Sequence, residues 1–237
     1  MPDLLNFQFD EEVSFPHPLS SGFSDAPLAY GGTLSKQRLV MSYAYGIFPW
    51  YNEVPILWWY TQPRFVLFPQ DIKISKSMRQ VLRREPWKVT FNTAFSDVIR
   101  MCGATKRENQ EGTWINVDMI RAYEALHVDG WAHSVEVWSG EKLVGGLYGV
   151  LIGRIFYGES MFTHVSNASK AALIIMTKEM KARGLELIDC QQETPHLKSM
   201  GGKSLDGTVF YDKLFANRRA NESCMFPVES VKLPFLV

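Results

Sequence analysis

The chain has 237 residues, enough for one large domain or two unequal domains with a substantial core. Its 25 basic and 25 acidic side chains cancel, so net charge alone does not attract the protein to nucleic acid or to a membrane surface. The three cysteines form no CxxC pair, which argues against a zinc site or a disulfide framework and fits a reducing compartment. No apolar run approaches transmembrane length and the acidic first residues do not resemble a signal peptide, so we expect a cytoplasmic protein without a membrane partner.

The N-terminal quarter is predicted to form a small domain, residues 1–62, ahead of a larger domain, residues 63–237. Residues 1–33 are rich in Pro, Gly and Ser and are expected to be mostly irregular. The next segment, LSKQRLVMSYAYG, predicts a helix that Ser35 caps and Gly46 ends. An aromatic, proline-rich stretch then leads to the expected boundary.

The segment ISKSMRQVLRRE predicts an amphipathic helix with one apolar face and one basic face. The basic face carries Lys76, Arg79, Arg83 and Arg84. Most such faces are simply solvated, but this one is clustered in a protein without net charge. We therefore consider it a candidate surface for the phosphates of an RNA.

The rest of the chain predicts a mixed α/β fold with a mixed central sheet. Apolar spacing predicts helices over residues 93–103 and 117–129. Alternating apolar residues from His133 to residue 162 predict three strands joined by tight turns. A helix follows from Ser166 or Asn167 to Gly184, and LELIDCQ predicts another strand. A strand, a helix and a strand in this order form a crossover, which makes the two strands parallel neighbours.

Two carboxylates lie at the ends of these predicted parallel strands. Asp189 ends the apolar run LELID with no basic neighbour in sequence, and Gln191 follows on the same side of the strand. On the preceding strand, Glu159 is predicted to share a face with Tyr157 and Met161. One such acid is most simply a hydrogen-bonded part of the core. Two of them, each near the carboxyl end of its strand, favour a functional site.

Tryptophan and histidine residues offer further candidates. Trp58 and Trp59, in the proline-rich segment, are predicted to pack the small domain against the larger one. Trp114, between two predicted helices, is a better candidate for a ring offered to a ligand, because stacking on a nucleobase contributes about 1–3 kcal/mol. The five histidines are dispersed and are interpreted as structural or surface residues, so we predict no metal site.

Nine short words of the sequence resemble the leucyl/phenylalanyl-tRNA–protein transferase family. Each word alone is weak, but the nine occur in the family's order over most of the chain, which makes the resemblance specific. The words are YAYGIFPWY (43–51), ILWW (56–59), PRFVL (63–67), EGTWI (111–115), HSVEVW (133–138), LVGGLYGV (143–150), FYGESMF (156–162), NASKAAL (167–173) and LIDCQ (187–191).

The resemblance implies an activity and a fold. The activity is transfer of Leu, Phe or Met from an aminoacyl-tRNA to the N-terminal Arg or Lys of an acceptor protein, which marks that protein for degradation. The fold is a small N-terminal domain joined to an N-acetyltransferase-like (GNAT-like) domain. Aminoacyl-tRNA is an activated ester, so attack by an amine requires alignment and charge relief rather than ATP or a metal. We therefore expect no cofactor.

The resemblance also implies roles for individual residues. Asp189 and Gln191 correspond to the family's catalytic pair, and Glu159 belongs to the same pocket. Trp50 and Trp114 lie where the aminoacyl-adenosine end binds. The apolar amino-acid pocket corresponds to Leu147, Phe156, Met161, Leu173 and Ile188. Whether Asp189 accepts a proton or only orients Gln191 stays open.

Some positions depart from common family forms, and two other functions remain open. Leu147 stands where some members have Met, and YTQ (60–62) replaces a more usual Ser-Pro-Asp/Asn. After SMGG, LDG (205–207) stands where Ile-x-Arg is usual. An acyl-CoA N-acetyltransferase would share the fold, but SNASK at the helix start lacks its pyrophosphate loop. A non-catalytic RNA-binding module would leave Asp189, Gln191 and Glu159 without a role.

Overall fold

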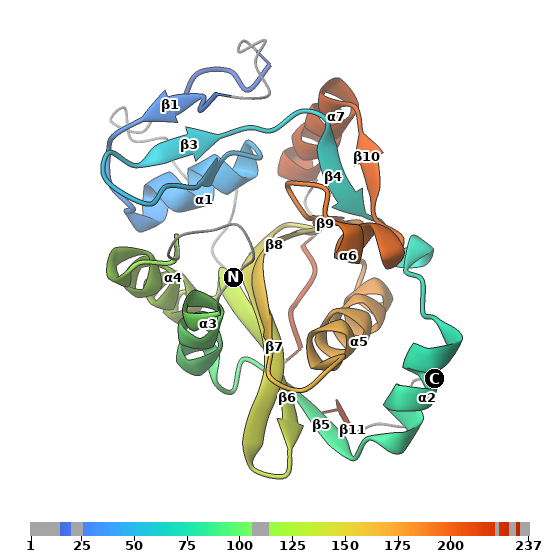
Figure 1. The fold of residues 1–237 in the computed structure, drawn as a ribbon. Coiled ribbons are helices and arrows are strands. Elements are labelled where there is room, and N and C mark those ends of the chain that lie inside the picture. The colour runs from blue at the N-terminus through green and yellow to red at the C-terminus, as the bar shows by residue number, and fades with distance from the viewer. Residues whose placement is uncertain (1–14, 20–25, 106–113, 221–222, 228–230, 233–237) are drawn as a thin grey trace.

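The computed structural model describes residues 15–19, 26–105, 114–220, 223–227 and 231–232. Most of the acidic N-terminal lead and the first part of the EGTWI word fall outside the described residues. Within them, the mixed α/β class predicted from the sequence is confirmed, with a small N-terminal region beside a large mixed sheet (Figure 1).

The N-terminal region combines one helix with a small antiparallel sheet. Helix α1 (Lys36–Ala44) begins as predicted, because the Ser35 hydroxyl accepts a hydrogen bond from the backbone N–H of Arg38 at 3.3 Å. The helix is followed by Gly46, whose φ of 73° lies in the left-handed region that glycine tolerates best. The small sheet has the order β1-β3-β2 and comprises β1 (Ala29–Tyr30), β2 (Phe48–Pro49) and β3 (Leu57–Trp59).

The large sheet has eight strands in the order β10-β4-β9-β8-β7-β6-β5-β11. Strands β8 and β9 pair in parallel, as the predicted crossover requires, and the other neighbouring pairs are antiparallel. The strands are β4 (Arg64–Leu67), β5 (Trp87–Phe91), β6 (Ala132–Ser139), β7 (Lys142–Ile152), β8 (Ile155–Thr163), β9 (Leu187–Asp189), β10 (Lys203–Leu205) and β11 (Val231–Lys232).

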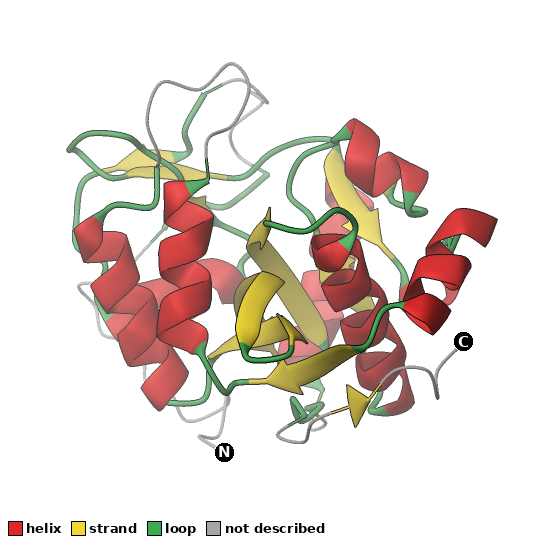
Figure 2. Ribbon diagram, turned by 60° about the horizontal axis from the view of Figure 1, so that its bottom comes forward, coloured by secondary structure: helices red, strands yellow, loops and turns green. Residues whose placement is uncertain are grey.

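Helices cover both faces of this sheet (Figures 1 and 2). On one face, α1, α3 (Phe95–Ala104), α4 (Val117–Val128) and α7 (Gly207–Arg219) contribute to a buried apolar cluster that includes Tyr43 and Tyr123. On the other face, α2 (Lys76–Arg84) and α5 (Ala168–Ala182) contribute to a second cluster that includes Leu147. Two short helices, η1 (Pro69–Asp71) and α6 (Pro195–Ser199), lie in the connections.

Several elements were not predicted from the sequence. Strands β4, β5 and β10 and helix α7 lie in segments without a clear local pattern, and β4 enters the sheet between β9 and β10. Tyr43 of the N-terminal region packs in the same cluster as Tyr148 of β7, so the two parts share one core. The domain boundary near residue 62 stays a prediction.

Strand β8 contains a bulge at the position of Glu159. Tyr148 of β7 faces Ser160, whereas the next residue, Gly149, faces Gly158, so β8 has one extra residue between them. The side-chain alternation therefore reverses at this point. Tyr157 packs in the cluster beneath α1, whereas Met161 packs against the cluster beneath α5. The prediction that Tyr157 and Met161 share one face is wrong for this reason.

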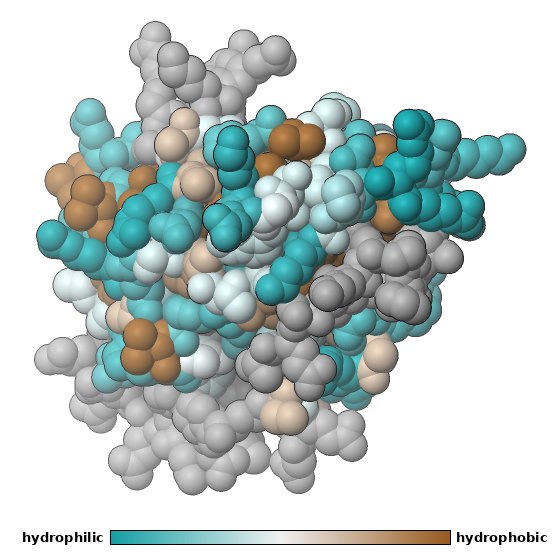
Figure 3. All heavy atoms as spheres, turned by 90° about the horizontal axis from the view of Figure 1, so that it is seen from below, coloured by the Kyte–Doolittle hydropathy of each residue, from teal (hydrophilic) through white to brown (hydrophobic). Residues whose placement is uncertain are grey.

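None of the described helices is long and apolar enough to cross a membrane. Figure 3 shows a face on which polar residues surround scattered apolar side chains. Among the described residues, no group of three or more His, Cys, Asp or Glu side chains is placed to hold a metal ion.

Candidate active site

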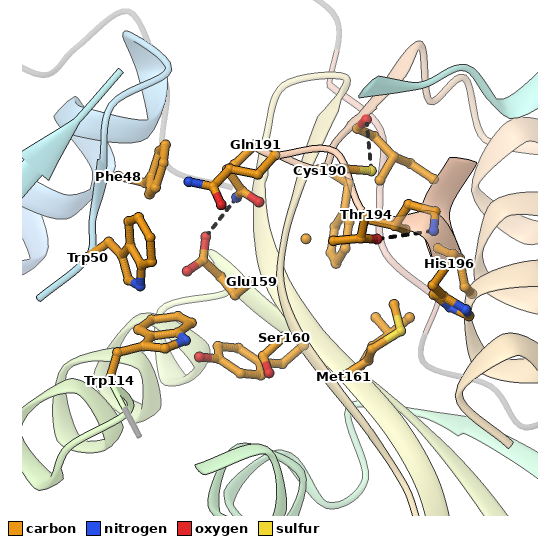
Figure 4. A pocket seen from close by; sticks show the side chains of 18 of the residues that line it. Phe48, Trp50, Trp114, Glu159, Ser160, Met161, Cys190, Gln191, Thr194 and His196 are labelled. Carbon is orange, nitrogen blue, oxygen red and sulfur yellow. Dashed lines mark hydrogen bonds between the residues drawn. The ribbon is translucent and has the colours of Figure 1, made fainter. Parts of the chain in front are cut away.

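A cavity of about 410 Å³ opens beside the middle of β8, where β9 ends and the N-terminal region meets the sheet (Figure 4). Glu159 lies in the middle of β8, so the prediction that it stands near the carboxyl end of its strand is wrong. The two ends of the cavity differ in chemistry. Trp50, Trp114, Glu159 and Gln191 gather at one end, and Met161 and His196 lie at the other. The lining residues are Phe48, Pro49, Trp50, Trp114, Leu147, Tyr148, Phe156, Gly158, Glu159, Ser160, Met161, Leu173, Ile188, Cys190, Gln191, Gln192, Thr194, His196 and Leu197.

The two tryptophans form an aromatic wall at the polar end. Trp114 is 7% exposed, and Trp50 is partly buried. Trp50 is held by Trp59, whose indole N–H donates to the Trp50 carbonyl at 2.7 Å and whose ring centroid lies 5.5 Å from that of Trp50. The flat faces of the two wall residues suit a nucleobase or another planar group.

Glu159 stands at the bulge of β8 and is held from two sides. The Tyr123 hydroxyl donates to its Oε2 at 3.3 Å, and the Gln191 amide donates to its Oε1 at 3.3 Å. The Tyr43 hydroxyl hydrogen-bonds in turn with that of Tyr123. Burial raises the pKa of the Glu159 carboxyl to about 8, although the Tyr43 and Tyr123 hydroxyls act in the opposite direction.

Gln191 has a backbone conformation that the structure around it enforces. Its φ of 56° is left-handed, which is uncommon for a residue other than glycine. Its N–H donates to Oδ1 of Asp189 at 2.9 Å, and its carbonyl accepts from the Thr61 hydroxyl at 3.0 Å. These bonds turn the chain sharply after β9, which points the Gln191 side chain at Glu159 rather than along the strand.

Asp189 is fully buried and paired with Arg64. The Arg64 Nε and one terminal nitrogen donate to the two carboxylate oxygens at 2.8 and 2.6 Å, and both side chains are 0% exposed. That terminal nitrogen also donates to the Gly46 carbonyl at 2.8 Å. Asp189 therefore contacts the cavity through Gln191 and is not itself among the described residues that line it.

The apolar end contains every residue predicted for the amino-acid pocket. Leu147, Phe156, Leu173 and Ile188 are at most 3% exposed, and Met161 is partly buried beside them. They come from β7, β8, α5 and β9, so no single segment makes the slot. Burial raises the pKa of the adjacent Cys190 thiol well above its ordinary value, which leaves a neutral, weakly polar side chain on the wall. Such a slot suits a leucine-sized or benzyl-sized group.

Sequence reasoning missed two kinds of residue in this region. Arg64 was not singled out, although a lone arginine in the buried strand RFVL is itself a signal of a buried partner. The sequence predicts a structural or surface role for His196, yet this residue lines the cavity. Burial and the charge of Lys170 lower its pKa, which favours the neutral imidazole.

The predicted basic face lies outside the cavity, on α2. Met78 and Leu82 are buried against the sheet, whereas Lys76, Arg79, Arg83 and Arg84 are exposed. Ser75 caps the helix by accepting from the Met78 N–H at 3.1 Å. The amphipathic pattern predicted for this segment is confirmed, and its basic face is exposed, with Arg79 Nε donating to the Ile74 carbonyl at 3.3 Å.

Comparisons with known proteins point to a single family. Residues 66–215 match the family described as leucyl/phenylalanyl-tRNA protein transferase, and residues 32–62 match the N-terminal domain of that family. A leucyl/phenylalanyl-tRNA–protein transferase of Syntrophobacter fumaroxidans is 50% identical over 212 residues, which cover 89% of this chain and 90% of the relative.

Two further relatives carry the same name. The one from Desulfatibacillum aliphaticivorans is 47% identical over 209 residues, covering 88% of this chain and 89% of its own. The one from a Shewanella species is 44% identical over 229 residues, covering 95% and 97%. The chain therefore belongs to the leucyl/phenylalanyl-tRNA–protein transferase family.

Proposed function

We propose that this protein transfers leucine, phenylalanine or methionine from an aminoacyl-tRNA to the N-terminal Arg or Lys of acceptor proteins. The new peptide bond gives the acceptor an apolar N-terminal residue and marks it for degradation that depends on that residue. The observation that carries the proposal is the two-ended cavity, in which an apolar slot adjoins an acid, an amide and two indole rings.

Each end of the cavity supports one part of the substrate. Leu147, Phe156, Met161, Leu173 and Ile188 would bury the aminoacyl side chain, and full burial of such a side chain contributes about 1.5–3 kcal/mol. Trp50 and Trp114 would stack on the terminal adenosine of the tRNA. The ester then lies beside Gln191, between the two ends.

Asp189 and Gln191 are proposed as the catalytic pair, with separate roles. The Asp189 carboxylate orients Gln191 through the 2.9 Å bond to its backbone N–H. The Gln191 amide contacts the attacking amine or the oxyanion that develops on the ester carbonyl. Fixed positioning of this kind lowers the barrier because the reacting groups are aligned before the reaction.

The domain organisation and fold relationship are part of the proposal. A meander of β6, β7 and β8 that feeds a parallel β8-α5-β9 unit supports a GNAT-like domain over residues 63–237, with residues 1–62 as a small N-terminal domain. The cavity draws Phe48 and Trp50 from the N-terminal region and Gln191 from the larger one, so both regions are required for binding.

The exposed basic face of α2 is proposed as a contact for the tRNA backbone. Each phosphate contact adds to the salt dependence of binding, because counterions are released when a phosphate is neutralised. Arg83→Ala should weaken tRNA binding and reduce the slope of log K against log salt by about 1. Arg100→Ala, at an exposed position of α3 and paired with Glu124 at 2.9 Å, is the matched control that should leave the slope unchanged.

Transfer is tested with a peptide that begins with Arg and is incubated with Leu-tRNA, Phe-tRNA or acetyl-CoA. The expected result is a leucyl or phenylalanyl mass added to the peptide, and none to a peptide that begins with Glu. Acetyl addition would instead identify an acyl-CoA N-acetyltransferase. Salt-sensitive tRNA binding without any addition would identify a non-catalytic RNA-binding module.

A further inference from the structure

The attacking amine must lose a proton during transfer, and Asp189 and Glu159 differ in their capacity to accept it. Asp189 is fully occupied: Arg64 donates to both carboxylate oxygens, and the Gln191 N–H donates to Oδ1 as well. It is also 0% exposed and does not line the cavity among the described residues. A proton from a substrate has no direct route to its oxygens.

Glu159 occupies the opposite situation. It lines the cavity and is partly exposed to it. Its oxygens accept hydrogen bonds from Tyr123 and Gln191, and the Tyr43 hydroxyl also bonds to it; because a carboxylate has about four acceptor sites, capacity remains for a substrate. The bulge in β8 turns its side chain into the polar end, where the Gln191 amide marks the expected position of the ester (Figure 4).

We infer that Glu159 is the group that accepts the proton of the attacking amine, and that Tyr123 and Tyr43 are positioning residues for its carboxylate. This inference rests on the proposed transfer activity and assigns one step within it. Asp189 keeps the role of orienting Gln191, and Arg64 holds Asp189 in place for that role.

The step balances without any further reactant. The lone pair of the neutral acceptor nitrogen forms a bond to the ester carbonyl carbon, and that nitrogen gives one proton to Glu159. The carbonyl carbon's bond to the ribose oxygen then breaks, and the leaving oxygen takes the proton from Glu159. The products are the extended peptide and free tRNA, and Glu159 returns to its starting form.

The charged and titratable groups around Glu159 suit a base for an amine. Tyr43 approaches from α1, Tyr123 from α4, Asp189 from β9 and Arg64 from β4, and burial outweighs the stabilising contacts among them. The result is a pKa of about 8, close to the value of about 7.7–8.0 for an α-amino group. A base whose pKa matches that of the proton donor is the efficient choice near neutral pH.

The pH dependence of kcat/KM for the acceptor peptide tests the assignment. Both the amine and Glu159 must lose a proton before reaction, so below pH 7 the wild-type logarithm of kcat/KM should rise with a slope approaching 2. Glu159→Gln should lower kcat/KM by about 100-fold or more and reduce this slope to 1, because only the amine then titrates. Asp189→Asn should be slower than wild type but keep the slope of 2.

Conservative tyrosine variants separate positioning from general structure. Tyr123→Phe removes a donor to the Glu159 carboxylate, so its profile should move to higher pH. Tyr60→Phe is the matched control, because its buried hydroxyl donates to the Gly207 carbonyl at 3.0 Å and does not touch Glu159. Its profile should stay in place.

The possible failures are distinguishable. Wild-type enzyme that transfers nothing at any pH overturns the proposed function. If the wild type transfers but Glu159→Gln keeps a slope of 2 in log kcat/KM against pH, the assignment of Glu159 is overturned and the function stands. The same holds if only Asp189→Asn shows a slope of 1. An unshifted Tyr123→Phe profile overturns the positioning role of the tyrosines.

Discussion

The buried pair of Arg64 and Asp189 should dominate the stability of the site, and Arg64→Met tests it. The change leaves the Asp189 carboxylate in an apolar interior without its cation, and it also removes the donor to the Gly46 carbonyl. Breaking a fully buried pair from one side costs about 3–5 kcal/mol. Because a typical domain is stable by about 5–15 kcal/mol, this is a large fraction of the total.

The measurement is urea unfolding followed by tryptophan fluorescence, with two comparison variants. Lys203→Met breaks an exposed pair with Asp71, whose Nζ–Oδ2 distance is a similar 2.7 Å, and should cost about 0–1 kcal/mol. The double variant Arg64→Met with Asp189→Asn removes the unpaired charge but keeps an oxygen to accept from the Gln191 N–H. It should recover about 2 kcal/mol of the loss.

Two results would refute this reasoning about the pair. One is an Arg64→Met variant that loses no more stability than Lys203→Met, since burial would then make no difference. The other is a double variant that is no more stable than Arg64→Met alone, since the loss would then not come from an uncompensated carboxylate.

Three further changes test other parts of the site. Glu159→Gln should stabilise the fold more at pH 8 than at pH 5, by on the order of 2 kcal/mol in urea unfolding. The reason is that the Glu159 carboxyl has a pKa of about 8 in the folded protein, so the wild type loses stability as the pH rises from the carboxyl's pKa in the unfolded chain towards 8. Equal effects at both pH values would contradict the raised pKa. Gly158→Ala should fold normally but transfer poorly, because its new Cβ meets only the Asp189 carbonyl at 3.7 Å and otherwise enters the cavity. Gly149→Ala, in contrast, should not fold, because its Cβ would lie 2.1 Å from the Tyr157 carbonyl. Full activity of Gly158→Ala would show that this part of the cavity stays empty. Leu147→Ala and Leu151→Ala remove buried side chains from the same face of β7 and should each cost about 2–5 kcal/mol of stability, but only Leu147 lines the cavity, so only its loss should lower kcat/KM for leucine transfer, by about 10-fold or more. Equal kinetic effects of the two leucine variants would mean that the apolar end does not hold the aminoacyl side chain.

The elements that the sequence predicts well are those with a local cause. The α1 helix follows from a serine cap and a stop at Gly46, and α2 follows from its regular apolar spacing. The predicted crossover fixed β8 and β9 as parallel neighbours, which places Glu159 and Gln191 within hydrogen-bond distance. The residues predicted for the apolar pocket also line one cavity. They could be predicted one by one because each falls within a short sequence word that resembles the family.

The elements that the sequence does not predict depend on distant partners. Strand β4 has four residues and no alternation, because it is buried on both faces between β9 and β10. The bulge at Glu159 reverses the alternation of side chains along β8, and the spacing of apolar residues in the sequence does not indicate the extra residue. Helix α7 gains its stability from packing Phe210 and Leu214 into a core built by other segments.

Asp189 shows where the two kinds of information divide. Its sequence alone determines that a carboxylate ends a buried strand and therefore requires a partner, since an isolated buried charge is too costly. Only the tertiary structure decides which partner, because Arg64 lies 125 residues away and reaches Asp189 through the pairing of β4 with β9. Paired with Arg64, Asp189 bonds to the Gln191 N–H, while Glu159 is the acid that lines the cavity. This arrangement follows from the order of the strands and not from any local pattern.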